Sequence, residues 1–319
     1  MIQKGLWRML GVSLLALVPA RIIYTMCFYD PDNGVYRDGG GWGYLLIILF
    51  LLAGAVLFFM CRQDNRAVME YSPKTMRGPG MLALISGVAL LYQSVSSIVV
   101  ITGEGHGAGS ASPVGSQPLV DSLTALIGII AAVCMMCWGG SLLNRGSLFA
   151  DYPLVGLAAP VWACFNLAVL FINYTAVSSN QDNFYVLVPY CFAAVFLFHQ
   201  GNCFSRVGGP HARRKLYQYG APFILLGLGS SLPSLVAAVF GLPSSSSIRI
   251  EYHIVLFCLS LYALSLLWKM RRDTRMLLRG RKPGSLSPAF WDAESRNMTG
   301  GSTKAQPAQP DVSPEEAGE

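Results

Sequence analysis

Sixteen consecutive residues, from Leu45 to Met60, carry no charged or strongly polar side chain. Seven other stretches of the chain are nearly as apolar, and all are longer than the roughly 10–14 residues typical of a buried helix in a soluble core. Runs of about 20 apolar residues are the length that a helix needs to cross a bilayer. The chain is therefore expected to fold in a membrane.

The expected spans take up just over half of the 319 residues. A β-barrel would show strands of about ten residues that alternate between polar and apolar side chains, and Leu45 to Met60 does not alternate. Only 13% of the residues are charged, against roughly 25% in soluble domains. The sequence predicts an all-α, polytopic transmembrane helix bundle of eight spans, at about 8–29, 43–61, 80–101, 119–138, 153–174, 183–200, 219–241 and 249–269.

Lysine and arginine residues are divided unevenly between the connections. Twenty of the 23 fall in the two termini and the connections on one side, Arg37 and Arg249 fall on the other, and Arg21 lies inside the first span. Because cytoplasmic loops retain cations, this bias predicts that both termini are cytoplasmic. The net charge of +6 belongs to that face and favours anionic lipid headgroups as its partner, with no reason to expect nucleic acid.

The first span has a second interpretation. Lys4, Arg8 and the apolar run that follows resemble a secretory signal, and Val18-Pro19-Ala20 could be its cleavage site. The apolar run resumes at Ile22 and becomes long enough to cross, so we expect an uncleaved helix. Cleavage would leave seven spans.

Three segments are expected along the chain: a bundle over 1–270, a basic juxtamembrane segment over 271–296 and a disordered cytoplasmic tail over 297–319. The tail is rich in Gly, Ser, Gln, Pro and Glu, which cannot bury enough apolar surface to fold. Cations that follow the last span are expected to contact anionic lipid; they are Lys269, Arg271, Arg272 and Arg275.

The bundle contains a weak indication of a four-plus-four repeat. The fourth span begins with Asp121 and ends with Trp138, and the eighth begins with Glu251 and ends with Trp268. Parallel repeats of this kind occur in transporters. The ordinary preferences of acids for helix N-termini and of tryptophan for membrane interfaces would give the same pattern, so both interpretations stay open.

One region resembles a known group. The stretch from Pro153 through Pro160-Val161-Trp162 to Tyr174-Thr175, and the stretch from Arg213-Arg214-Lys215 to Ser231-Leu232-Pro233, resemble polytopic membrane proteins of anaerobic Gram-positive bacteria. The likeness covers roughly 120–270. That group has no assigned activity, so the resemblance implies a bacterial plasma membrane and transfers no functional residue.

Catalytic and metal signatures are weak. Cys134 and Cys137 form a CxxC, but it has no βαβ context and no neighbouring cation to activate a thiolate, so we expect both to pack between helices. The four histidines do not have the spacing that places two ligands on one helix face. We expect no metal, no cofactor and no enzymatic activity.

Polar residues at membrane depth give the one site hypothesis. Arg21 lies about eight residues, or some 12 Å, below the outer end of its span, where an arginine must reach the surface or find a partner. We expect a pocket in the outer half of the bundle in which Arg21 pairs with one of two acids. Each acid could instead cap its helix, and the amides could simply join helices. The expected pocket residues are Arg21, Gln93, Asp121, Asn166, Ser230, Ser231, Ser234 and Glu251.

These observations favour a membrane scaffold, accessory or sensor-like component whose membrane protein partner is unknown. The alternative is a small-solute carrier that uses the outer pocket. A tightly packed interior would favour the scaffold, and polar residues that converge on a water-accessible cavity would favour the carrier.

Overall fold

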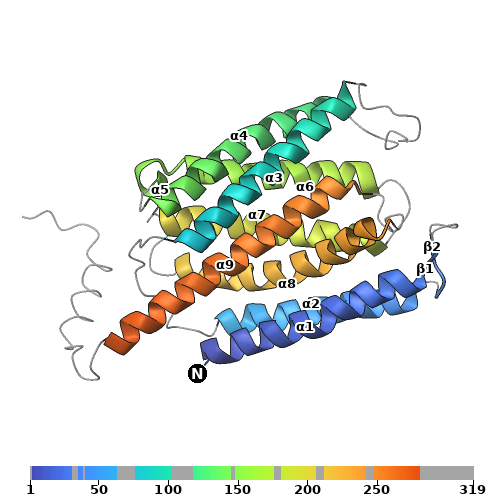
Figure 1. Ribbon diagram of the computed structural model, residues 1–319, viewed down its shortest axis with the longest axis horizontal. Helices are drawn as coiled ribbons and strands as arrows, with labels where there is room; N and C mark the ends of the chain where they lie inside the picture. The colour runs from blue at the N-terminus through green and yellow to red at the C-terminus, as the bar shows by residue number, and fades with distance from the viewer. Residues whose placement is uncertain are drawn as a thin grey trace, which may run out of the picture. The chain divides into compact units, whose positions relative to one another are not determined.

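The computed structural model describes residues 2–30, 35–38, 40–62, 76–102, 118–144, 148–175, 181–205, 212–241 and 248–280. Over these residues the order of elements is α1 (Ile2–Phe28), β1 (Tyr29–Asp30), β2 (Val35–Tyr36), α2 (Gly41–Arg62), α3 (Arg77–Ile101), α4 (Pro118–Leu143), α5 (Leu148–Asp151), α6 (Val155–Thr175), α7 (Gln181–Phe204), α8 (Ala212–Val239) and α9 (Ile250–Gly280). Figure 1 shows their arrangement.

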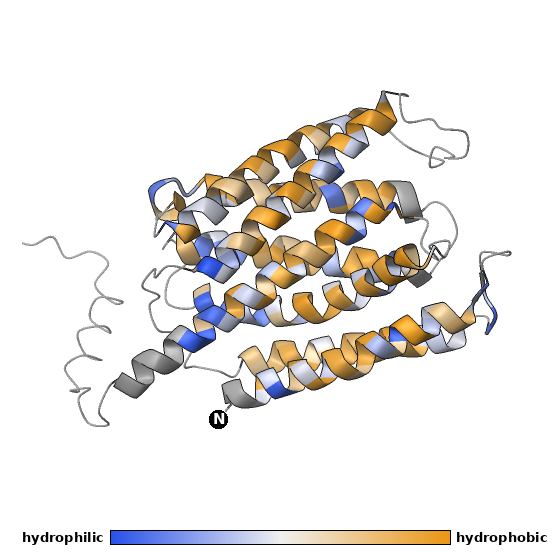
Figure 2. Cartoon of the chain, in the orientation of Figure 1, coloured by the Kyte–Doolittle hydropathy of each residue, from blue (hydrophilic) through white to orange (hydrophobic). Residues whose placement is uncertain are grey.

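Eight of the described helices are long and apolar enough to cross a membrane, so the predicted fold class, an all-α polytopic bundle of eight spans, is confirmed. Every long helix coincides with one expected window, and α8 and α9 extend beyond theirs by several residues. The protein is an integral membrane protein. Figure 2 shows hydrophobic residues along the lengths of these helices.

Two small elements were not predicted. The strands β1 and β2 form an antiparallel pair in which Tyr29 lies opposite Tyr36, and this hairpin joins α1 to α2. The four-residue helix α5 follows α4, and its Phe149 ring stacks on Trp138 with 3.9 Å between ring centroids. Both elements are shorter than the windows in which apolar periodicity can be recognised.

The helices from α3 to α8 pack in a row. α3 lies against α4, α4 against α6, α6 against α7 and α7 against α8, while α1 and α2 lie against each other and against α8. In Figure 1 the pair α1 and α2 forms one edge of the bundle, and α3 and α4 form the opposite edge. α9 lies between α1 and α3, and a pocket lined by these three helices marks where they meet.

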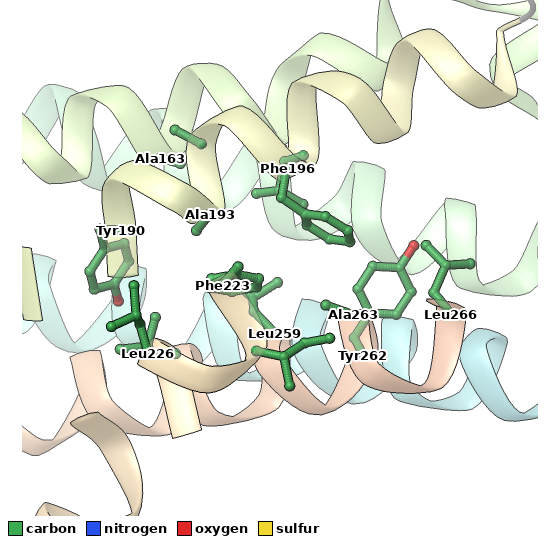
Figure 3. Close-up of a cluster of buried hydrophobic side chains, with 14 of the residues drawn as sticks. Ala163, Tyr190, Ala193, Phe196, Phe223, Leu226, Leu259, Tyr262, Ala263 and Leu266 are labelled. Atoms are coloured by element: carbon green, nitrogen blue, oxygen red, sulfur yellow. The ribbon is translucent and has the colours of Figure 1, made fainter. Parts of the chain in front are cut away.

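The helix α8 lies at the centre of the bundle. Its residues from Gly220 to Ser231 are all buried, which agrees with a sequence that is apolar on every side. Figure 3 shows the aromatic core around it. There Phe196 of α7 stacks on Phe223 of α8 with ring centroids 5.6 Å apart. Tyr262 of α9 also accepts a 2.8 Å hydrogen bond from Nε1 of Trp138 of α4.

The chain divides into two units, Met1–Met270 and Arg271–Glu319. The described part of the second unit is the end of α9, from Arg271 to Gly280. The expected juxtamembrane segment from 281 on and the expected tail over 297–319 lie outside the described residues. We call one end of the bundle the basic end; it is formed by Arg62, Arg77, Arg213 and Lys269. The opposite end is the distal end, and it is formed by Phe28, Ile101, Val239 and Ile250.

Candidate functional site

Two of the expected pocket residues bond directly to each other. Gln93 of α3 donates a hydrogen bond from Nε2 to Oδ1 of Asn166 of α6, over 3.0 Å. Both side chains are buried, with exposed fractions of 3% and 1%. Each lies eight or nine residues from the distal end of its helix, or roughly 12–14 Å at the rise of an α-helix. The sequence hypothesis named both residues, and the fold brings them together.

Two tyrosines continue this arrangement toward α7 and α9. The Asn166 side chain lies close to the hydroxyl of Tyr190 of α7, and this hydroxyl donates a 3.0 Å hydrogen bond to the carbonyl oxygen of Tyr252 of α9. Both tyrosines are buried. We call Gln93, Asn166, Tyr190 and Tyr252 the polar layer. It ties α3, α6, α7 and α9 together at one level of the bundle.

The hydrogen-bonding capacity of the polar layer is not filled. Gln93 Oε1 is buried and has no hydrogen-bond partner among the described residues. A buried amide group that makes no hydrogen bond costs about 1–3 kcal/mol. The layer therefore offers one hydrogen-bond acceptor, Gln93 Oε1, at membrane depth.

Closer to the distal end, α3 and α9 are joined by charged residues. Ser96 donates a 2.6 Å hydrogen bond to Oε1 of Glu251, and Arg249 donates a 2.8 Å bond from Nη2 to the Ser97 hydroxyl. Glu251 lies in the first turn of α9, as the helix-cap alternative expects, and one oxygen of its carboxylate accepts the bond from Ser96.

Asp121 also lies near this cluster. It is half-buried in the first turn of α4, and its carboxylate and that of Glu251 are close enough to Tyr252 to act on it electrostatically. The two acids of the expected pocket are thus gathered on the α3, α4 and α9 side of the bundle.

Arg21 lies in a different environment. Its side chain is 4% exposed, and its guanidinium carbon lies 3.1 Å from the centroid of the Tyr185 ring of α7. Tyr185 also donates a 3.3 Å hydrogen bond to the carbonyl oxygen of Gly43 at the start of α2. Arg21 is thus held in a cation–π contact on the side of α1, α2 and α7, and it does not snorkel to the surface.

The serines of α8 face α9. Ser230 and Ser231 are buried and Ser234 is half-buried. Ser231 donates a 2.7 Å hydrogen bond to the carbonyl oxygen of Gly227, and Gly227 lies against Ser260 of α9. Because positions three, four and seven residues apart share a helix face, all three serines lie on the α9 side of α8.

The expected pocket residues therefore fall into four groups. Gln93 and Asn166 lie in the polar layer, and the two acids lie near the distal ends of α4 and α9. Arg21 lies against α7, and the three serines lie on the α9 side of α8. Tyr190 and Tyr252 were missed because tyrosine within a span looks apolar. For Tyr190 the available signal is that a buried tyrosine hydroxyl needs a hydrogen-bond partner. Tyr252 takes part through its backbone carbonyl oxygen, for which the sequence carries no signal.

One pocket among the described residues lies away from these groups. It has a volume of about 430 Å³ and opens between α1, α3 and α9. We call it the lateral groove; its walls include Trp7, Gly11 and Leu14 of α1, Leu82 of α3, and Leu261 and Trp268 of α9. Its surface is almost entirely apolar.

The remaining sequence-based expectations concern cations, cysteines and a repeat. Lys269 is half-buried, Arg271 is buried and Arg272 is exposed, and the side chain of Arg275 lies outside the described residues. Cys134 and Cys137 are unbonded thiols within α4. The two tryptophans of the expected repeat differ in environment, because Trp138 is 2% exposed and Trp268 is 55% exposed.

Comparison of this chain with models of protein families, with curated proteins and with solved structures finds no match.

Proposed function

We propose that this protein is a membrane scaffold or accessory component that acts through its helix surfaces and basic end, and that it does not pass a solute through its interior. The observation that carries the proposal is the burial of its membrane-depth polar groups. Gln93, Asn166 and Arg21 are 3%, 1% and 4% exposed. Side chains that line a cavity large enough for water would have larger exposed fractions.

The polar groups at depth contact one another or aromatic rings. Gln93 bonds to Asn166 and Arg21 lies on the Tyr185 ring. In lipid no hydrophobic force draws helices together, so interhelical hydrogen bonds and close packing have to supply the association. A polar layer that serves this purpose needs no ligand, which agrees with a scaffold.

We also propose that the protein is not an enzyme. The polar layer consists of two side-chain amides, the Tyr190 phenol and the backbone carbonyl of Tyr252, and it contains neither a pair of carboxylates nor a nucleophile next to a base. Among the described residues, no three His, Cys, Asp or Glu lie together as a metal site would require.

The proposed location is the plasma membrane of a bacterium, with both termini and the basic end in the cytoplasm. Two observations support it: the uneven division of lysine and arginine between the connections, and the resemblance of the region around 120–270 to membrane proteins of anaerobic Gram-positive bacteria.

A small-solute carrier is the second candidate, because one observation favours it. The free oxygen of Gln93 could bind a polar solute. Pro189, beside Tyr190 in α7, and Pro233 in α8 interrupt the backbone hydrogen bonding of their helices near the same level, as the broken helices of carriers do.

Thiol labelling distinguishes the two candidates. In a chain whose eight native cysteines are replaced by alanine, the variants Asn166→Cys and Phe240→Cys are compared in proteoliposomes with a small charged thiosulfonate. Phe240 is 66% exposed in the turn after α8 and is the accessible control. For a scaffold, Cys at 166 should react roughly 100-fold more slowly than Cys at 240, which corresponds to an opening free energy of about 3 kcal/mol.

A rate at position 166 within about tenfold of the control would favour the carrier. Leu126→Cys serves as a second control, because Leu126 is 56% exposed on the lipid-facing side of α4. Cys at 126 should stay unreactive whether the protein is a scaffold or a carrier. This control shows that the reagent reacts with cysteines that contact water and not with every exposed side chain.

A further inference from the structure

The lateral groove exists because α1 and α9 run antiparallel in register and one position between them lacks a side chain. Trp7 meets Trp268 edge to face, with ring centroids 5.0 Å apart, and Leu14 and Leu261 line the groove seven residues further along each helix. A Cβ built on Gly11 would meet no atom within 4 Å. The groove therefore runs roughly 10 Å from the tryptophan pair toward the middle of the bundle.

The lining of the groove is suited to a hydrocarbon chain. Its walls are leucine and tryptophan side chains, with Ser265 as the polar member. Trp268 is 55% exposed and faces the surroundings of the bundle. Tryptophan favours the level of lipid headgroups, so the pair marks where a chain in the groove would join its headgroup.

Cations surround this end of the groove. Arg8 directly follows Trp7 and is exposed, and Lys269 directly follows Trp268. Arg77 begins α3 next to Gly78, whose α-carbon faces Ser265 of the groove. The first turns of α1 and α3 contain no acidic residue. Three positive side chains thus lie at the level where a lipid phosphate would sit.

From this arrangement we infer that the lateral groove binds one anionic phospholipid, with an acyl chain between α1 and α9 and its phosphate at the tryptophan pair. Apolar contact alone cannot select a lipid, because the bilayer offers the same hydrocarbon surroundings. The charge of the headgroup supplies the preference for an anionic lipid. Each cation near the membrane surface attracts such a lipid strongly enough to change its occupancy about fivefold. The inference does not depend on the scaffold proposal.

Quenching of tryptophan fluorescence tests this inference in the full chain. The protein is placed in nanodiscs in which a brominated acyl chain is carried either by phosphatidylglycerol or by phosphatidylcholine. Bromine quenches tryptophan fluorescence on contact. Half-maximal quenching should therefore need at least about fivefold less brominated phosphatidylglycerol than brominated phosphatidylcholine. Equal quenching by the two lipids would overturn the inference.

Two sets of variants locate the effect. Gly11→Phe fills the groove, and Gly140→Phe is its matched control, because a Cβ at Gly140 of α4 also meets no atom within 4 Å. The preference for phosphatidylglycerol should disappear with Gly11→Phe and persist with Gly140→Phe. Loss in both, or in neither, would contradict the groove as the binding site.

The charge of the rim is tested separately. The double variant Arg8→Gln and Lys269→Gln keeps the apolar walls and removes two cations. In this variant the amounts of the two lipids that give half-maximal quenching should lie within about twofold of each other, because the cations that supply the preference are reduced. An unchanged preference would show that the headgroup is not recognised at this rim.

Discussion

Gln93 of α3 and Asn166 of α6 lie 73 positions apart in the sequence and are joined by a 3.0 Å hydrogen bond. α3 packs mainly on α4, and α4 in turn packs on α6, so the long glutamine side chain reaches across to a helix that is not its main neighbour. The bond fixes the level of α3 relative to α6 and thereby the position of the whole polar layer.

A double-mutant cycle measures this bond. Gln93→Leu and Asn166→Leu should each destabilise the folded protein by about 1–2 kcal/mol, because each leaves the other amide buried without its partner. The double variant should cost less than the sum of the two, by about 0.6–1.7 kcal/mol, which are the average and the largest coupling typical of interhelical hydrogen bonds in a membrane protein. Unfolding in mixed micelles gives the three free energies, and strictly additive effects would contradict the contact.

The eight spans could be predicted from the sequence because hydrocarbon excludes charge from each span and fixes its length. The run from Leu45 to Met60 lies within α2, whose bounds are Gly41–Arg62. The short helix α5 and the hairpin of β1 and β2 could not be predicted. Their few residues are held by individual contacts such as that between Phe149 and Trp138, which no local pattern encodes.

The candidate site could be predicted only in part. Gln93 and Asn166 were recognised because amides at membrane depth need partners. The contacts of Arg21 could not be predicted, because the sequence does not show which helix faces α1. The structure places the Tyr185 ring there, and the face of an aromatic ring attracts a cation.

The close contact of α3 and α4 depends on Gly139. A Cβ at this position would lie 2.8 Å from the carbonyl oxygen of Gly80 and 2.9 Å from the backbone nitrogen of Leu84, and neither backbone atom can move aside. Gly139→Ala should therefore cost about 1–3 kcal/mol, as overpacking typically does. The neighbouring Gly140→Ala is the matched control, since its Cβ meets nothing within 4 Å, and it should be neutral or slightly stabilising. Equal losses in the unfolding free energy would contradict this packing.

The ring of Tyr185 is predicted to contribute more to the stability of the fold than its hydroxyl does. Tyr185→Leu removes the aromatic face below the buried Arg21 guanidinium and should destabilise the fold by about 2 kcal/mol. Tyr185→Phe keeps the ring and removes only the bond to Gly43, which should cost about 0.5–1 kcal/mol. Thermal or detergent unfolding ranks the two variants, and a phenylalanine variant as unstable as the leucine variant would contradict the cation–π contact.

Asp38 makes the corner between the hairpin and α2 sensitive to acid. Burial would raise the pKa of its carboxyl, but hydrogen bonds from Trp42 N, Gly40 N and the Tyr24 hydroxyl lower the pKa below its ordinary value of 3.8. Because the pKa is lower in the folded state, the stabilisation is complete above the unfolded pKa and is lost as the pH falls through the folded pKa.

Asp38→Asn should therefore unfold at a lower temperature than the natural protein near pH 6, and the difference should shrink below about pH 4, where the natural carboxyl is protonated in the unfolded state. Thermal unfolding from about pH 6 to pH 3 measures this difference. A difference that stays constant over this range would contradict the role of the ionised carboxylate.

Amide hydrogen exchange in nanodiscs tests most directly whether the interior around the polar layer is closed to water. The relevant peptides cover 88–98 of α3 and 161–171 of α6, with the exposed turn at Phe240 and Gly241 as the fast reference. A packed interior predicts that both peptides remain protected for longer than about an hour, the range in which exchange reports opening. Exchange of both peptides within minutes, at a rate near that of the turn, would show that water reaches Gln93 and Asn166 and would contradict the account.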